Sequence, residues 1–157
     1  MQRVSPQPVA TRPITQWLRP LVSITLLLLA AQFLVGMLVN LYVKVPASHP
    51  GADAPEYFSG VARGVAWALV YSEWALKVHA IVGLLVFLVA LAILALAIRQ
   101  RERAWIIAAA FGLLGILAAG FNGASFLNYG HDFSSLLMSI GFLTAVVAYA
   151  LGMYHTR

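Results

Sequence analysis

Four apolar runs constrain this chain more than any other feature of its sequence. The hydrocarbon core of a bilayer is about 30 Å thick, so a helix that crosses it needs about 20 mostly apolar residues. The predicted spans are residues 21–43, 78–98, 104–121 and 133–154. The third is short for a crossing and is expected to extend through Asn122 to Phe126. Because 62% of the 157 residues are hydrophobic and only 10% are charged, a soluble domain of this length could not bury its apolar surface. The sequence therefore predicts an all-α integral membrane protein, a bundle of four transmembrane helices.

The basic residues predict the orientation of this bundle, because cytoplasmic loops carry an excess of lysine and arginine. With the N-terminus inside, seven basic residues are cytoplasmic: Arg3, Arg12, Arg19, Arg99, Arg101, Arg103 and Arg157. Three are outside: Lys44, Arg63 and Lys77. Both termini are therefore expected in the cytoplasm. Residues 1–20 contain four prolines and are predicted to be a disordered cytoplasmic tail, and the preference for arginine over lysine favours a bacterial inner membrane.

The first outer loop, residues 44–77, is expected to contain a short helix. Residues 55–72 are apolar but are interrupted by Arg63 and glycines, and they lie too close to the second span to make another crossing. Tryptophan is enriched at the membrane–water interface. The loop therefore predicts an interfacial helix, with Trp67 and Trp74 at headgroup depth, that covers the outer end of the bundle.

Composition excludes several classes of protein. The chain has no cysteine, which excludes disulfides, iron–sulfur clusters and c-type haem attachment. Its net charge of +5 lies at the ends of the spans, where topology and anionic lipid account for it, so no nucleic acid is expected as a partner. No nucleotide-binding loop, Ser-His-Asp layout or zinc-protease motif is found. The expected partners are the lipid bilayer and either a larger membrane complex or further copies of the chain.

Two histidines give the sharpest indication of chemistry. His79 lies near the start of the second span, and His131 lies just before the fourth. These spans run in the same direction and are diagonal partners in a four-helix bundle, so both imidazoles are expected at the outer face. Gly83, one turn from His79, would leave a space beside the imidazole for a flat macrocycle. The pair predicts axial ligation of haem b; the alternative is that both histidines are only interfacial.

Other outer residues extend this prediction and leave alternatives open. Lys44, Arg63 and Lys77 would neutralise haem propionates at the outer rim, or pair with the acidic residues of the same face. A third imidazole, His49, lies in the outer loop. Together with the two histidines above, it leaves open a copper or zinc site at the outer face.

Polar amides within the spans form a second cluster. Gln32, Gly36 and Asn40 recur at four-residue spacing in the first span, and Asn122 and Asn128 flank the outer end of the third. An amide without a partner is costly in lipid, so these side chains are expected to face the bundle or water. They would line a pocket for a quinone or small polar ligand, or form hydrogen bonds between helices. We favour the hydrogen bonds.

The layout of spans and histidines resembles one half of a haem A synthase. That family is built from two four-helix halves, each able to hold a haem between histidines of its second and fourth helices. The matching residues are His79, in Lys77-Val78-His79-Ala80, and His131, in Tyr129-Gly130-His131-Asp132. The family's His-Arg pair is His79-Ala80 here, so the resemblance implies the haem-holding layout and not a haem-oxidising activity. The segment 121–130 also resembles that of small uncharacterised four-helix bacterial membrane proteins, a likeness that implies no activity.

The leading interpretation is a membrane-embedded b-type haem protein for electron transfer or redox sensing at the outer face. Its metal ligands would be His79 and His131, and bis-imidazole ligation favours electron transfer because both axial positions are filled. Two alternatives stay open. One is a cofactor-free accessory or assembly subunit of a larger membrane complex, and the other is the copper or zinc site.

Overall fold

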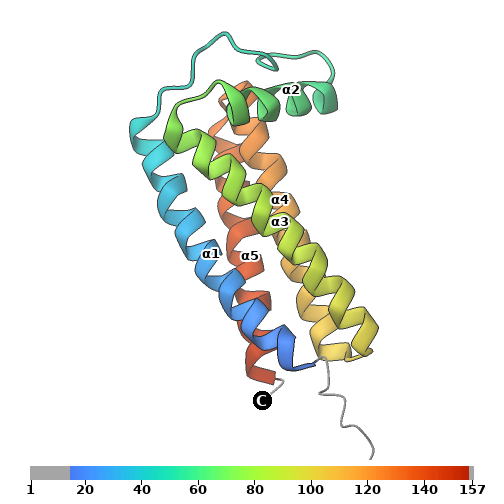
Figure 1. Cartoon of the computed structure of the whole chain (residues 1–157). Coiled ribbons are helices and arrows are strands. Elements are labelled where there is room, and N and C mark those ends of the chain that lie inside the picture. Colours follow the sequence, from blue (N-terminus) through green and yellow to red (C-terminus); the bar gives the residue numbers. More distant parts are fainter. Residues whose placement is uncertain (1–14, 156–157) are drawn as a thin grey trace, which may run out of the picture.

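The computed structural model describes residues 15–155, and every regular element in this range is a helix (Figure 1). The five helices are α1 (Thr15–Tyr42), α2 (Tyr57–Val70), α3 (Trp74–Gln100), α4 (Arg103–Tyr129) and α5 (Asp132–His155). All except α2 are long and apolar enough to cross a membrane. The predicted all-helical class with four long apolar helices is therefore confirmed, and the chain is a helical membrane protein.

The helices begin and end at residues that hydropathy alone does not mark. Residues 1–14 of the predicted tail lie outside the described range, and α1 already begins at Thr15, with Pro20 inside it. The third long helix, α4, includes the expected extension through Asn122 to Phe126 and continues through Asn128 to Tyr129. Gly130, with a φ of 66°, ends α4 in the left-handed conformation, which glycine adopts without strain.

The four long helices pack in the order α1, α3, α4, α5. The α4–α5 hairpin has the most extensive interface, and α3 packs against both α1 and α4. Contact between α1 and α5 is limited, and the backbones of α3 and α5 do not approach each other closely. The short helix α2 lies across one end of the bundle, on α3 and α4 (Figure 1). We call this the capped end, and the end that holds the start of α1 and the end of α5 the open end.

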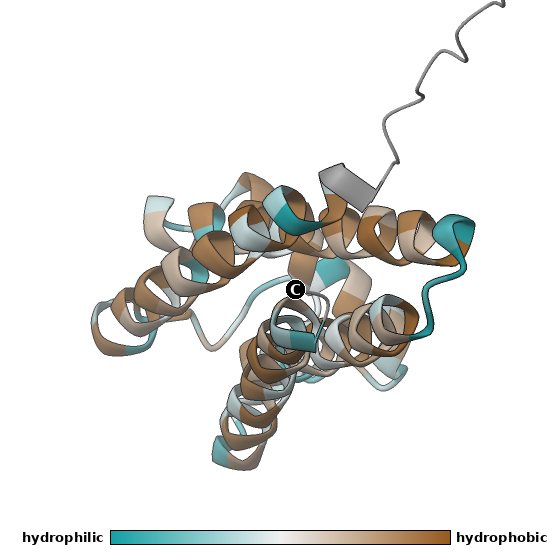
Figure 2. Cartoon of the chain, turned by 90° about the horizontal axis from the view of Figure 1, so that it is seen from below, coloured by the Kyte–Doolittle hydropathy of each residue, from teal (hydrophilic) through white to brown (hydrophobic). Residues whose placement is uncertain are grey.

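The long helices are mostly hydrophobic along their length, and several of the hydrophilic residues stand at helix ends and links (Figure 2). Large side chains such as Leu27, Leu34 and Leu143 are more than half exposed. Inside, small residues bring backbones together, as is common in membrane helices. A Cβ on Gly115 of α4 would lie 2.6 Å from the Gly141 carbonyl oxygen of α5, so this hairpin has no space for a larger residue there.

Candidate functional site

His79 faces α1, where it meets the amide of Gln32. The Gln32 Nε2 atom donates a hydrogen bond to the His79 carbonyl oxygen at 3.0 Å and lies 3.3 Å from His79 Nε2. An amide nitrogen can only donate, so the contact makes His79 Nε2 the acceptor and leaves Nδ1 with the proton of a neutral ring. His79 Nδ1 and Gln32 Oε1 are buried without a hydrogen-bond partner. The predicted hydrogen bonding between helices therefore joins α1 to α3.

Two glycines make this contact possible. A Cβ on Gly36 of α1 would lie 2.8 Å from His79 Cε1, and a Cβ on Gly83 of α3 would lie 3.0 Å from Gln32 Nε2. Each helix thus places a polar side chain in a notch left by a glycine of the other. We call Gln32, Gly36, His79 and Gly83 the α1–α3 polar lock. The space expected beside Gly83 is filled by Gln32 and is not open.

His131 lies elsewhere, in the short link between α4 and α5. Its side chain is exposed, and its ring centroid lies 6.3 Å from that of Tyr129. Its carbonyl oxygen accepts a hydrogen bond from the Ser134 N–H at the start of α5. His79 packs against Gly36 of α1, whereas His131 stacks on Tyr129 at the end of α4, so the two imidazoles have different neighbours.

The three outer cations also have different surroundings. Arg63 of α2 donates to the Ser59 carbonyl oxygen at 3.3 Å and to the Ser59 hydroxyl at 3.4 Å. Lys77 is half-buried in the first turn of α3, and Lys44 is exposed in the loop after α1, where it lines a small cleft together with Glu73. Each of the three cations therefore has its own set of neighbours.

His49 is a structural residue of the outer loop. Its ring stacks on Trp67 of α2, with centroids 4.6 Å apart. Its Nε2 lies 3.1 Å from the Leu127 carbonyl oxygen, and its Nδ1 lies 3.2 Å from the Pro50 carbonyl oxygen. Both ring nitrogens thus face carbonyl oxygens, which leaves neither directed at a metal. Among the described residues, no group of three or more His, Asp or Glu side chains could hold a metal ion.

The loop between α1 and α2 closes onto the last turn of α4, and together with α2 it forms what we call the cap, residues 49–70. The Asp53 N–H donates to the Asn128 carbonyl oxygen at 3.2 Å, and the Tyr129 hydroxyl donates to the Ala54 carbonyl oxygen at 3.1 Å. The hydroxyls of Tyr57 and Ser125 lie 2.8 Å apart. These contacts explain why α4 stays helical through its polar last turns.

Glycines let the cap approach closely. A Cβ on Gly51, which has a φ of 104°, would lie 2.5 Å from the Gly60 carbonyl oxygen. A Cβ on Gly64 would overlap the Asn128 side chain, which is only 4% exposed and whose two polar atoms have no hydrogen-bond partner. Sequence reasoning missed this role of His49 and the glycines, although the four-residue step from Gly60 to Gly64 is a known signal of close helix packing.

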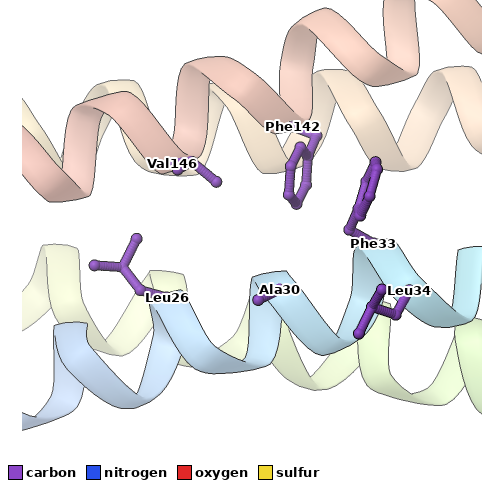
Figure 3. Close-up of a pocket in the computed structure, with 6 residues that line it drawn as sticks. All are labelled: Leu26, Ala30, Phe33, Leu34, Phe142 and Val146. Atoms are coloured by element: carbon purple, nitrogen blue, oxygen red, sulfur yellow. The ribbon is translucent and has the colours of Figure 1, made fainter.

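An apolar recess lies between α1 and α5 (Figure 3). It has a volume of about 360 Å³ and is lined by Leu26, Ala30, Phe33, Leu34, Phe142 and Val146. Phe33 and Phe142 stack across it with ring centroids 5.5 Å apart. We call it the α1–α5 groove. Neither this groove nor the smaller cleft at Lys44 is lined by a histidine.

Fold and site together define a small helical membrane protein with a capped four-helix bundle and an apolar side groove. Comparisons with protein-family models, with curated proteins and with solved structures found no match.

Proposed function

We propose that this protein is an accessory or assembly subunit that needs no cofactor of its own and packs against a larger membrane complex through the α1–α5 groove. The proposal rests on a difference between the histidines, which make contacts within the fold, and the α1–α5 groove, which is open and apolar. Two of the three outer histidines, His49 and His79, are engaged in contacts that hold the fold together. The α1–α5 groove is lined only by apolar side chains.

The groove suits a helix of a partner protein. Membrane helices associate through close van der Waals packing, which small residues at the contact allow. Ala30 is such a residue, and it lies between Leu26 and Leu34 in one row along α1 (Figure 3). The limited contact between α1 and α5 leaves this row open toward the membrane, and Phe33 remains 51% exposed. We place the complex in the bacterial inner membrane, with the capped end outside.

A photo-reactive side chain tests this proposal in intact cells. With the probe in place of Phe33 or Phe142, we expect a discrete adduct with a second protein after illumination. The matched control is Leu27, which is 71% exposed and lies on α1 outside the groove. Lipid adducts alone at the groove positions, or equal protein adducts at Leu27, would contradict the proposal. An adduct at twice the mass of the chain would identify a second copy as the partner.

Haem binding is the competing proposal, supported by the resemblance to a haem A synthase half. It requires His79 to leave the α1–α3 polar lock and His131 to turn inward from an exposed link. An absorbance spectrum of protein purified from haem-supplied cells separates the two proposals. We expect no Soret band. A reduced-minus-oxidised haem signal that His79→Ala and His131→Ala both alter would replace the accessory-subunit proposal with the haem proposal.

A further inference from the structure

A small cleft at the capped end combines apolar and charged side chains. It has a volume of about 110 Å³ and lies where the end of α1, the end of α2 and the start of α3 meet. Its lining residues are Val43, Lys44, Val45, Pro46, Trp67, Tyr71, Ser72, Glu73 and Leu76. We call it the rim cleft.

The two charges of the rim cleft are opposite in sign and unpaired. Lys44 and Glu73 are both exposed, and within residues 15–155 neither forms an ion pair. Glu73 is the N-cap residue of α3, yet its side chain makes no capping hydrogen bond. Glu56, the N-cap of α2, makes two. The Glu73 carboxylate and the Lys44 ammonium are therefore both available to a ligand that carries the complementary charges.

The position of the rim cleft matches the headgroup layer of a bilayer. The candidate spans Trp17–Tyr42 and Trp74–Gln100 end and begin beside it. Trp67 and Tyr71 line it, and such side chains favour the interface because their rings combine an apolar body with a polar atom. Leu76, which is 8% exposed, closes its apolar side. The headgroup of a lipid in this cleft would contact the charged side chains of Lys44 and Glu73, and the start of its acyl chains would contact the apolar side chains.

We propose that the rim cleft binds the headgroup of a zwitterionic phospholipid with a primary amine, a phosphatidylethanolamine. Its phosphate pairs with the Lys44 ammonium, and its ammonium donates hydrogen bonds to the Glu73 carboxylate. A quaternary choline group has no N–H to donate, and a glycerol headgroup has no positive charge for Glu73. The preference for an ethanolamine headgroup follows from the Glu73 carboxylate. This lipid site does not depend on the proposal that the protein is an accessory subunit.

Native mass spectrometry of the full chain in detergent measures this preference directly. The protein is titrated with phosphatidylethanolamine, phosphatidylcholine and phosphatidylglycerol that have identical acyl chains. We expect the ethanolamine lipid to bind most tightly. Glu73→Gln should weaken it by up to about fivefold, the effect of losing an exposed ion pair, and should remove the preference over choline. Lys44→Gln should weaken all three lipids.

The matched control is Arg63→Gln, which removes an exposed cation of α2 that does not line the rim cleft. It should leave all three affinities unchanged. Equal affinities of the wild-type protein for the three lipids, or a preference that survives Glu73→Gln, would overturn the proposal. Displacement of the lipid by an equal concentration of free phosphoethanolamine would assign the cleft to a soluble phosphate ester and overturn the lipid as its source.

Discussion

Four large polar side chains of this bundle are each paired with a glycine on a neighbouring helix. The pairs are His79 with Gly36, Gln32 with Gly83, Asn128 with Gly64 and Tyr149 with Gly112. A glycine removes the volume that the polar side chain needs, so helices can stay close without exposing the polar group to lipid. The glycine provides space but no hydrogen bond: Tyr149 is completely buried beside Gly112, and its hydroxyl has no hydrogen-bond partner.

The α1–α3 polar lock predicts that Gly36→Val destabilises the bundle. The added side chain would displace the His79 imidazole, and overpacking of this kind costs about 1–3 kcal/mol of unfolding free energy. His79→Ala in the same chain should recover part of this loss, so the two substitutions should be non-additive. Unfolding in mixed micelles of increasing SDS fraction measures both effects. Gly120→Val is the control, since no atom lies within 4 Å of a Cβ there; equal losses at both glycines would contradict the lock.

Sequence reasoning placed His79 on the correct face of its helix but could not identify the helix that it faces. His79, Gly83, Val86 and Ala90 share one side of α3, and helical spacing alone predicts that much. Whether this side meets α1 or α5 depends on helix rotation and on which side chains fill the notches. These are properties of the packed bundle, and in it His79 lies against Gln32 and Gly36 of α1.

Among the elements, α2 depends most clearly on a single charged residue. Glu56 accepts hydrogen bonds from the backbone N–H groups of Ser59, at 2.6 Å, and Phe58, at 3.0 Å. These bonds, with that from Ser59 the strongest, lower the pKa of Glu56 below its usual 4.5. The ionised cap therefore stabilises α2 fully above that usual pKa, and the stabilisation is lost as the pH falls through the lowered one.

Hydrogen exchange at the start of α2 should follow this titration. We expect protection of the Ser59 amide to be constant near neutral pH and to fall in acid, after correction for intrinsic exchange, as Glu56 becomes protonated. In Glu56→Gln the same amide should be less protected at neutral pH and should show no acid-dependent loss. Identical pH profiles for the two proteins would show that another group caps α2.

The depth of α2 in the membrane is a second prediction about this element. The chain has no cysteine, so Ala66→Cys and Leu27→Cys each carry one nitroxide label without further changes. Both positions are exposed, Ala66 on α2 and Leu27 within a candidate span. If α2 is interfacial, power saturation should place the Ala66 label at headgroup depth and the Leu27 label in the hydrocarbon. A label at Ala66 as deep as that at Leu27 would contradict an interfacial α2.

Hydropathy predicted the existence of these elements better than their ends. The short helix expected at residues 55–72 is α2, Tyr57–Val70, because Glu56 caps it and Tyr71 ends it. The third span, 104–121 with its extension to Phe126, stops short of the end of α4 at Tyr129, since Asn128 looks like part of a link in a hydropathy pattern. In the folded protein, Ser125 bonds Tyr57 and Asn128 packs on Gly64, so the polar turns are helical under the cap.

At the scale of the whole molecule, the start of α1 and the end of α5 lie at the same end of the bundle (Figure 1). Arg99, Arg101 and Arg103, at the α3–α4 link, lie at this open end too, as an alternation of four spans requires. The positive-inside rule then predicts that the open end is cytoplasmic. A reporter fused after Arg157 should be active only in a form that works in the cytoplasm. Alkaline phosphatase activity from the same fusion point would reverse the orientation.

The cap also dictates an order of events during synthesis. Its bonds join residues far apart in the chain: His49 to Leu127, Asp53 to Asn128 and Ala54 to Tyr129. The ribosome completes the first two long helices and α2 well before it reaches residue 129. Until the end of α4 emerges on the same side of the membrane, the loop has nothing to close upon. Closure of the cap is therefore a late step of biogenesis, and a protease on that side would cut stalled chains in a loop that the finished protein protects.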